Sequence, residues 1–190
     1  MLEPCDLFLL CKIAMMAYLT PEDELQLYSV INHTFEFNTK LTIGVNFGAK
    51  EIFLPETKSI VKLQIWDIAT KDCFNTVMKY YLEGASALLI VFNSKEGGLI
   101  SKVQKRVNQL KTKYQISKSS YPIMVLVDKE NLFPRSRIFN KTIAKVIGVD
   151  DYFEFDLKTG NMVEETFQMM AKFLTKNLIK HSVEREILSN

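Results

Sequence analysis

The 190-residue chain has neither a long hydrophobic run nor an excess of charge of one sign. Its longest apolar stretch, Leu7–Leu19, contains Lys12 and is shorter than the roughly 20 residues that a helix needs to cross a membrane. Glu3 and Asp6 precede it, where a signal peptide would carry basic residues. We therefore interpret this stretch as containing a buried strand.

The charges are nearly balanced, with 24 Lys and Arg against 22 Asp and Glu. This balance gives no electrostatic reason to expect nucleic acid or an anionic membrane as a partner. The last residues, REILSN, contain no cysteine. Prenylation requires one, so we expect no direct lipid anchor.

Cysteine and histidine are also scarce. Cys5, Cys11 and Cys73 lack the spacing of metal ligands, and their odd number is typical of reduced thiols in a cytoplasmic protein. His33 and His181 each stand alone in the sequence. We therefore expect no metal site and a cytoplasmic location.

Strand-like and helix-like segments alternate along the chain. Continuous apolar runs, as in Ser86–Asn93, are typical of strands covered on both faces, and the three-to-four spacing in Leu99–Tyr114 indicates an amphipathic helix. Thr20 with Pro21 predicts a helix start, and Gly148 a helix end. Strands are expected within 7–19 and at 46–54, 59–67, 86–93, 121–128 and 152–157, and helices at 20–35, around 77–82, and at 99–114, 136–148 and 162–181.

This order predicts an α/β fold with three layers. The sheet is doubly wound, six-stranded and mainly parallel, with one antiparallel edge strand contributed by an early hairpin. Residues 1–190 are expected to form a single domain, with a core at about 7–179 and a C-terminal helical tail at about 180–190. Ligands of such sheets bind outside the carboxyl ends of the strands.

Four segments resemble the Ras superfamily of small GTPases, most closely its Rab-type branch. They are KLTIGVNFGAKEIFL, VKLQIWD, YYLEGASALLIVFN and YFEFDLKTGNMVEETFQMMAKFL. Their order and spacing are similar to that family from about residue 7 to 179. The resemblance implies a P-loop NTPase-like fold, with GTP or GDP and Mg²⁺ at the carboxyl edge of the sheet.

The family's phosphate loop is missing between the first strand and the first helix. The family has G-x-x-x-x-G-K-[ST] there, and its glycines let backbone N–H groups cradle the phosphates. Residues 14–25, AMMAYLTPEDEL, contain no glycine or lysine, and Glu22, Asp23 and Glu24 bring negative charge instead. We expect side chains to fill the phosphate site. The candidates are Met15, Met16, Tyr18 and Pro21.

The switch regions are retained only in part. Thr42 and Asp67 match the family residues that reach Mg²⁺ and the terminal phosphate. The family follows its Asp with T-A-G-Q-E, in which the glycine contacts phosphate and the glutamine orients water. Thr70 and Lys71 stand in those two places, and lysine cannot accept a hydrogen bond from water. We hypothesise that Lys71 pairs with Asp67 or Asp72.

The base-recognition motifs are altered as well. Asp128-Lys129-Glu130-Asn131 aligns with N-K-x-D, so Asn131 replaces the carboxylate that recognises guanine. The family's S-A-K appears as residues 156–158, Asp-Leu-Lys, with a bulky leucine in the small position. We interpret the remaining lysines as solvated. The vestigial nucleotide-binding positions are Thr42, Asp67, Asp128, Lys129, Asn131 and Lys158.

Aromatic and apolar residues near the two switch regions form the partner-binding surface of the resembling family. Core packing is the simpler explanation for any single one here, whereas some of the group are expected to face outward. The candidates are Ile43, Phe47, Phe53, Trp66, Phe74, Tyr80 and Tyr81.

Two functions follow from the resemblance. The first is a catalytically inactive pseudo-GTPase that needs no cofactor and acts as a protein-interaction module or subunit of a larger complex. The second is a divergent small GTPase that binds GTP or GDP with Mg²⁺ as a switch, with Asn93–Gly98 as its only glycine pair near a lysine. A third hypothesis, another type of α/β enzyme, has no support in the sequence, because we find no Ser–His–acid or Cys–His arrangement.

Overall fold

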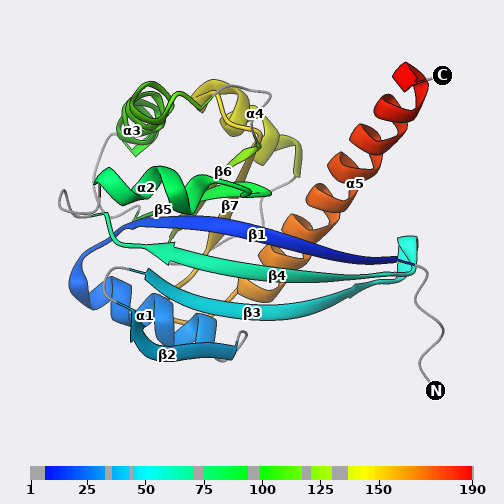
Figure 1. Cartoon of the computed structure of the whole chain (residues 1–190). Coiled ribbons are helices and arrows are strands. Elements are labelled where there is room, and N and C mark those ends of the chain that lie inside the picture. The colour runs from blue at the N-terminus through cyan, green and yellow to red at the C-terminus, as the bar shows by residue number, and fades with distance from the viewer. Residues whose placement is uncertain are drawn as a thin grey trace.

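The computed structural model describes residues 7–32, 36–42, 45–70, 75–93, 99–116, 121–129 and 137–189. In this part of the chain, seven strands form one sheet in the order β2-β3-β4-β1-β5-β6-β7 (Figure 1). The strands are β1 Leu7–Tyr18, β2 Glu36–Thr42, β3 Val45–Leu54, β4 Ser59–Ile68, β5 Ala87–Asn93, β6 Ile123–Asp128 and β7 Asp151–Phe155. The helices are α1 Pro21–Asn32, α2 Asn75–Leu82, α3 Leu99–Tyr114, α4 Arg137–Ile147 and α5 Val163–Ser189, and the short 3₁₀ turn η1 spans Pro55–Thr57.

The predicted fold class is confirmed, but the expected number of strands is wrong. β2 adds a strand at the edge, and it pairs antiparallel with β3, which in turn pairs antiparallel with β4. All other neighbours are parallel. The one reversed strand therefore lies inside the edge. The β2 sequence, EFNTKLT, escaped prediction because Glu, Asn and Lys are depleted in strands.

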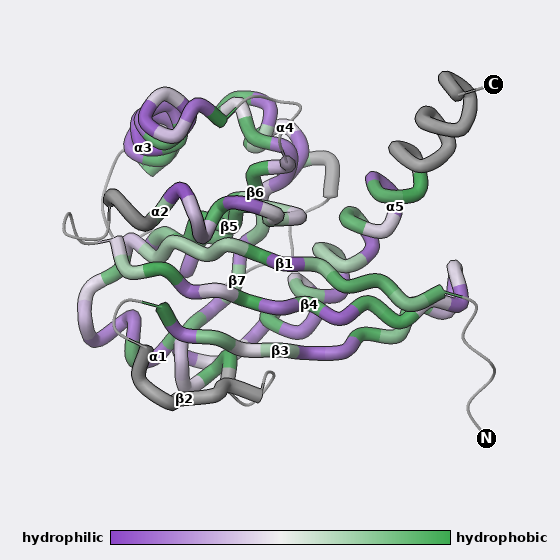
Figure 2. The backbone as a smooth tube through the Cα atoms, viewed as in Figure 1, coloured by the Kyte–Doolittle hydropathy of each residue, from purple (hydrophilic) through white to green (hydrophobic). Residues whose placement is uncertain are grey.

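Helices cover both faces of the sheet and divide the buried residues into two cores. One core joins the sheet to α1 and α5, through residues such as Leu27 and Phe167. The other joins it to α2, α3 and α4, through Met78, Val107 and Ile147. In Figure 2, hydrophobic and hydrophilic positions alternate along β4. Its odd-numbered residues from Val61 to Ile65 are buried and its even-numbered ones half-buried, so the α1–α5 face is the better covered there.

The N-terminal half of β1 differs from the expected buried strand. Phe8 and Leu10 are 57% and 56% exposed, whereas residues from Cys11 to Met16 are buried apart from Lys12. Phe8 pairs with Ile60 of β4, which pairs in turn with Phe53 of β3. Figure 1 shows that β1, β3 and β4 extend past α2, α3 and α4 at this end. Phe8, Leu10 and Phe53 are exposed there.

The predicted helix start at Thr20 and helix end at Gly148 are confirmed. The Thr20 hydroxyl accepts a hydrogen bond from the Asp23 backbone N–H (3.2 Å) and donates one to the Asp23 carboxylate (3.0 Å). Gly148 adopts φ = 83°, where glycine meets no steric penalty, and its N–H bonds Ala144 O at 2.9 Å. The two caps fix where α1 begins and α4 ends.

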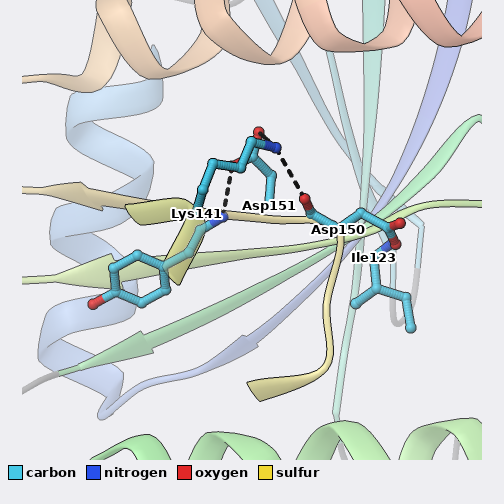
Figure 3. A network of polar contacts seen from close by, with 5 residues as sticks. Ile123, Lys141, Asp150 and Asp151 are labelled. Atoms are coloured by element: carbon cyan, nitrogen blue, oxygen red, sulfur yellow. Dashed lines mark hydrogen bonds and ion pairs between the residues drawn. The ribbon is translucent and has the colours of Figure 1, made fainter. Parts of the chain in front are cut away.

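A polar network ties α4 to the amino ends of β6 and β7 (Figure 3). Lys141 Nζ lies 3.2 Å from Asp151 Oδ2 and donates to Asp150 O at 3.1 Å. Asp150 Oδ2 accepts the Ile123 N–H at 2.8 Å. Asp151 is fully buried, and its Oδ1 accepts the Tyr152 N–H. Both oxygens of this buried carboxyl group therefore have a partner. This network lies at the edge opposite the carboxyl ends of the strands.

None of the described helices is long and apolar enough to cross a membrane. Cys11 is a buried free thiol, and burial raises its pKa to about 11. Among the described residues, no group of three or more potential ligands is placed to hold a metal ion. Cys5 and Cys73 lie outside the described residues.

Candidate functional site at the carboxyl edge

The connection from β1 to α1 consists of only two residues. β1 ends at Tyr18 and α1 begins at Pro21, so Leu19 and Thr20 are all that lies between them. A phosphate loop needs several successive backbone N–H groups that curve around the anion. Two residues, one of which caps the helix, cannot supply such a cradle. The expected loss of the phosphate loop is thus visible in the backbone as well as in the sequence.

A carboxylate occupies the first turn of α1. Asp23 is 5% exposed, and its Oδ2 accepts hydrogen bonds from the Thr20 hydroxyl and from Asn93 Nδ2, 2.5 Å away at the end of β5. A helix N-terminus attracts negative charge because its free N–H groups carry a partial positive charge. Asp23 supplies that charge from within the chain.

The proposed fillers of the phosphate site behave differently from one another. Met15 and Met16 are fully buried and belong to the two cores of the sheet, one to each face. They are therefore core residues, and that part of the expectation is wrong. Tyr18 lies at the edge itself, with its ring stacked on Phe92 at 5.4 Å. Pro21 is the first residue of α1, as its fixed φ favours.

Asp67, the predicted metal-associated residue, has a partner from α1. The Tyr28 hydroxyl donates a hydrogen bond to Asp67 Oδ2, and Asn46 Nδ2 donates to the same hydroxyl at 2.9 Å. Asn46 stands opposite Asp67 in the β3–β4 pairing. Burial, together with the nearby Glu24 carboxylate, raises the pKa of Asp67 to about 7. A carboxylate that binds Mg²⁺ needs the opposite, a strongly ionised state.

The groups expected beside a guanine base also bond within the chain. Asp128 is 3% exposed, and its Oδ1 accepts the backbone N–H of Leu157 at 2.9 Å. In the resembling family this N–H position faces the base. Leu157 is itself buried, with 2% of its surface exposed. The Asp156 carboxylate then accepts the N–H groups of Lys158 and Thr159, which shapes the turn after β7.

Lys129 is not simply solvated, which corrects the interpretation from sequence. Its Nζ lies 3.6 Å from Glu154 Oε1, a nearly buried carboxylate that also accepts a hydrogen bond from the Tyr152 hydroxyl. Glu154 would be costly to bury without such partners, because an ionised carboxylate loses its hydration there. Lys158 has an exposed side chain.

Several predicted residues lie wholly or partly outside the part of the chain that the structure describes. Thr42 ends β2 and pairs with Val45, but its side chain is not among those described. Ile43, Asn131 and Phe74 lie outside the described residues, and so do Lys71 and Asp72, so the proposed pairing of Lys71 stays a hypothesis.

Three of the aromatic candidates form a cluster on the α2 side of the sheet. The Phe47 and Trp66 rings meet edge-on at 5.6 Å, and Trp66 lies 6.4 Å from Tyr81 of α2. Lys12 Nζ sits 4.8 Å from the Trp66 ring centroid. All three rings are half-buried. We call Phe47, Trp66 and Tyr81 the aromatic cluster.

The other two described candidates face outward. Tyr80, next to the aromatic cluster on α2, is 72% exposed, and Phe53 at the far end of β3 is 51% exposed. Tyr80 and Phe53 therefore lie on the surface, and their role in a partner interface stays a prediction.

Taken together, these residues do not fit a magnesium-bound guanine nucleotide. The phosphate position meets the Asp23 carboxylate, the metal-associated carboxylate is held by Tyr28, and the N–H of Leu157 is used by Asp128. Like charges at contact distance repel by about 4 kcal/mol at an effective dielectric of 20. Each of these three positions is hydrogen-bonded within the chain itself.

The sheet is doubly wound, and its strand order reverses beside β1. Helix α1 starts at the carboxyl end of that strand. These features define the class of α/β proteins that bind ligands at this edge of the sheet. A model of the Ras family matches residues 26–176, so this chain belongs to the Ras family.

Its relatives include Rab-type proteins. The Ypt/Rab-type GTPase ypt7 of Schizosaccharomyces pombe is 26% identical over 157 residues, which cover 78% of this chain and 74% of that protein. Ras-related protein Rab-7L1 of Rattus norvegicus is 27% identical over 147 residues, covering 76% and 72%. Ras-related protein Rab-32 of Sus scrofa is 26% identical over 153 residues, covering 78% and 66%.

The residues that complete the edge are Tyr28, Asn46 and Asn93, and none of them was among the candidate site residues from the sequence. A signal for Tyr28 does exist, because a tyrosine inside an apolar helix face brings a hydroxyl that needs a buried partner. Nothing in the sequence indicates that this partner is Asp67.

Proposed function

We propose that this chain is a pseudo-GTPase: a Ras-family protein that binds no nucleotide, catalyses no hydrolysis, and serves as a protein-interaction module or subunit of a larger complex. The observation that carries this proposal is the Asp23 carboxylate at the first turn of α1, held by Thr20 and Asn93. A negative charge fixed there opposes a triphosphate through charge and through occupied donors.

The metal position supports the same proposal. Tyr28 supplies the hydrogen bond that Asp67 needs, so this buried carboxyl is satisfied by protein groups alone. With a pKa of about 7, Asp67 is partly protonated at neutral pH in the metal-free chain, and it would have to lose that proton before it could bind Mg²⁺. Since Lys71 also replaces the water-orienting glutamine of the family, hydrolysis has no group to direct it.

The alternative is a divergent GTPase that works as a switch. It draws on family membership, and on the name of one relative, the Ypt/Rab-type GTPase ypt7. It requires another set of phosphate donors in place of the missing phosphate loop.

The aromatic cluster is the surface that we propose for a protein partner. Half-buried Trp and Tyr side chains are frequent hot spots of interfaces, because they bury large areas while losing little conformational freedom. Lys12 over Trp66 and the exposed Tyr80 beside it extend this surface with charge and a hydroxyl.

Two measurements test the proposal. Purified protein is heat-denatured and the supernatant analysed by ion-exchange chromatography; we expect no guanine nucleotide, and stoichiometric GDP or GTP would establish the switch instead.

Partners are then captured from native extract with wild type, Tyr81→Ala and Leu25→Ala. Leu25 is 72% exposed on α1, at the other face of the sheet, so it serves as the matched control. A specific partner is expected to be lost with Tyr81→Ala alone, and equal capture by all three would exclude the aromatic cluster as its site.

A further inference from the structure

A cleft of about 590 Å³ opens at the carboxyl edge between the start of α1 and the side of α3. Tyr18, Phe92 and Leu99 provide its apolar wall, and Lys102, Lys105 and Arg106 of α3 provide its charge. The cleft lies at the end of β1 and β5, where the strand order reverses. It is separate from the aromatic cluster, which sits on β3, β4 and α2.

The positive charge of the cleft comes from one helix, α3. α3 has no acidic residue in its 16 positions, and hydrophilic residues predominate along it (Figure 2). Its cations are Lys102, Lys105, Arg106, Lys111 and Lys113. The chain as a whole carries a net charge of only +2, so the positive charge is concentrated on this helix.

Arg106 has a fixed position at the mouth of the cleft. Its guanidinium lies 4.4 Å from the centroid of the Tyr18 ring, which stacks in turn on Phe92 with an interplanar angle of 19°. Contact with an aromatic face leaves the edge of the guanidinium, with its N–H donors, available to a planar anion such as a carboxylate. Arg106 is held without an acidic partner among its described contacts.

We propose that this cleft binds an acidic peptide segment of a protein partner, with carboxylates on Lys102, Lys105 and Arg106 and an apolar side chain against Tyr18 and Phe92. The proposal adds a second interaction surface to the module. Because α3 carries only positive charges, it favours a negatively charged ligand. The apolar wall favours a peptide that has an apolar side chain between its acidic residues.

The shape and the acidic end of the cleft favour a peptide over other anions. A recess of this volume accepts protruding side chains, whereas a flat membrane surface meets only its rim. Asp23 lines one end of the cleft, and Glu22 precedes it on α1. A polyphosphate long enough to span the cleft would face the Asp23 carboxylate, while a peptide can place an uncharged residue there.

The test uses the full chain and a displayed library of random dodecapeptides. Peptides are selected on wild type and counter-selected on a variant with Lys102→Glu, Lys105→Glu and Arg106→Glu, and the recovered peptides are titrated by fluorescence polarisation. Enrichment in Asp and Glu around an aromatic or large aliphatic residue is expected. The dissociation constant should rise by about tenfold or more for Arg106→Glu. For wild type, it should also rise as the salt concentration increases.

Lys176→Glu on α5 is the matched control, because it makes the same charge change at another exposed position. Unchanged affinity for this variant is expected, and circular dichroism checks that every variant is folded. Recovered peptides without acidic enrichment, or with equal affinity for wild type and Arg106→Glu, would overturn the proposal. Displacement of the peptides by millimolar inorganic phosphate would replace it with a small-anion site, and Arg106-dependent binding to phosphatidylserine vesicles would replace it with a membrane contact.

Discussion

The hydroxyl of Tyr28 donates a hydrogen bond to the carboxyl group of Asp67, and so joins the second turn of α1 to the end of β4. Asn46 donates to the same hydroxyl from the neighbouring strand, which fixes the phenol between three elements. Asp67 is the position where the resembling family holds its metal ion. In this chain, the bond that stabilises the position comes from the protein.

Replacing Tyr28 with phenylalanine tests the value of that bond. The buried Asp67 loses its donor, so Tyr28→Phe is expected to lower the free energy of unfolding by about 1–3 kcal/mol. Urea denaturation with an unchanged m-value measures it. Tyr80→Phe removes a hydroxyl from a residue that is 72% exposed, and it should change stability by less than about 0.5 kcal/mol. Equal effects of the two substitutions would show that the Asp67 contact contributes nothing.

Asp67 should make stability depend on pH in a direction unusual for a carboxyl group. Its pKa is about 7 in the folded chain and about 4 when unfolded, so the folded state binds the proton more tightly. The stability that this proton contributes is present below pH 4 and is lost as the pH rises to 7. Asp67→Asn keeps a neutral acceptor for Tyr28. Its advantage over wild type should therefore grow from near zero at pH 4 to about 4 kcal/mol at pH 8.

Thermal or urea unfolding of both proteins across this pH range measures the difference. A constant difference, or one that grows toward acid, would mean that Asp67 is ionised in the folded chain and available to a cation.

Asp23 should be structurally important although it is one of three acids in a row. Asp23→Ala removes the acceptor of Thr20 and Asn93, and we expect it to cost about 1–2 kcal/mol. Glu22→Ala removes the same charge from an exposed neighbour, with an expected change below about 0.5 kcal/mol. Denaturant midpoints of the two variants give the comparison. Similar losses would indicate that charge at the helix start matters and the specific bonds do not.

The pairing of Lys129 with Glu154 gives a further prediction. Lys129→Ala removes the cation beside the Glu154 carboxylate, whose side chain is only 7% exposed, so a loss of about 1–3 kcal/mol is expected. Lys176→Ala, at an exposed site on α5, should be near neutral. Calorimetric melting temperatures distinguish the two. A neutral Lys129→Ala would restore the interpretation of this lysine as a solvated loop residue.

Much of the fold could be predicted from the sequence because the strongest patterns are local. The apolar run at 87–92, the three-to-four spacing of α3 and the cap at Thr20 each depend on neighbouring residues, and each matches the structure. β2 was missed because an edge strand needs little apolar content. Its partner β3, and not its own composition, makes it a strand.

The candidate site was less predictable, since its bonds connect residues far apart in the chain. Tyr28 and Asp67 are 39 positions apart, and Asp23 and Asn93 are 70 apart. The sequence showed which family groups had been lost, but it did not show which side chains had taken their place. That assignment depends on the register of β3 on β4 and on the face that α1 turns to the sheet.

A thermal shift with about 1 mM GTP and Mg²⁺ shows directly whether the carboxyl edge holds a guanine nucleotide. A site with a dissociation constant of about 10 μM would stabilise the fold by about 2.7 kcal/mol under these conditions. For a chain of this size, that corresponds to a rise in melting temperature of roughly 5–10 °C. We predict an unchanged melting temperature, whereas a rise of that size would show that the chain binds guanine nucleotide and is no pseudo-GTPase.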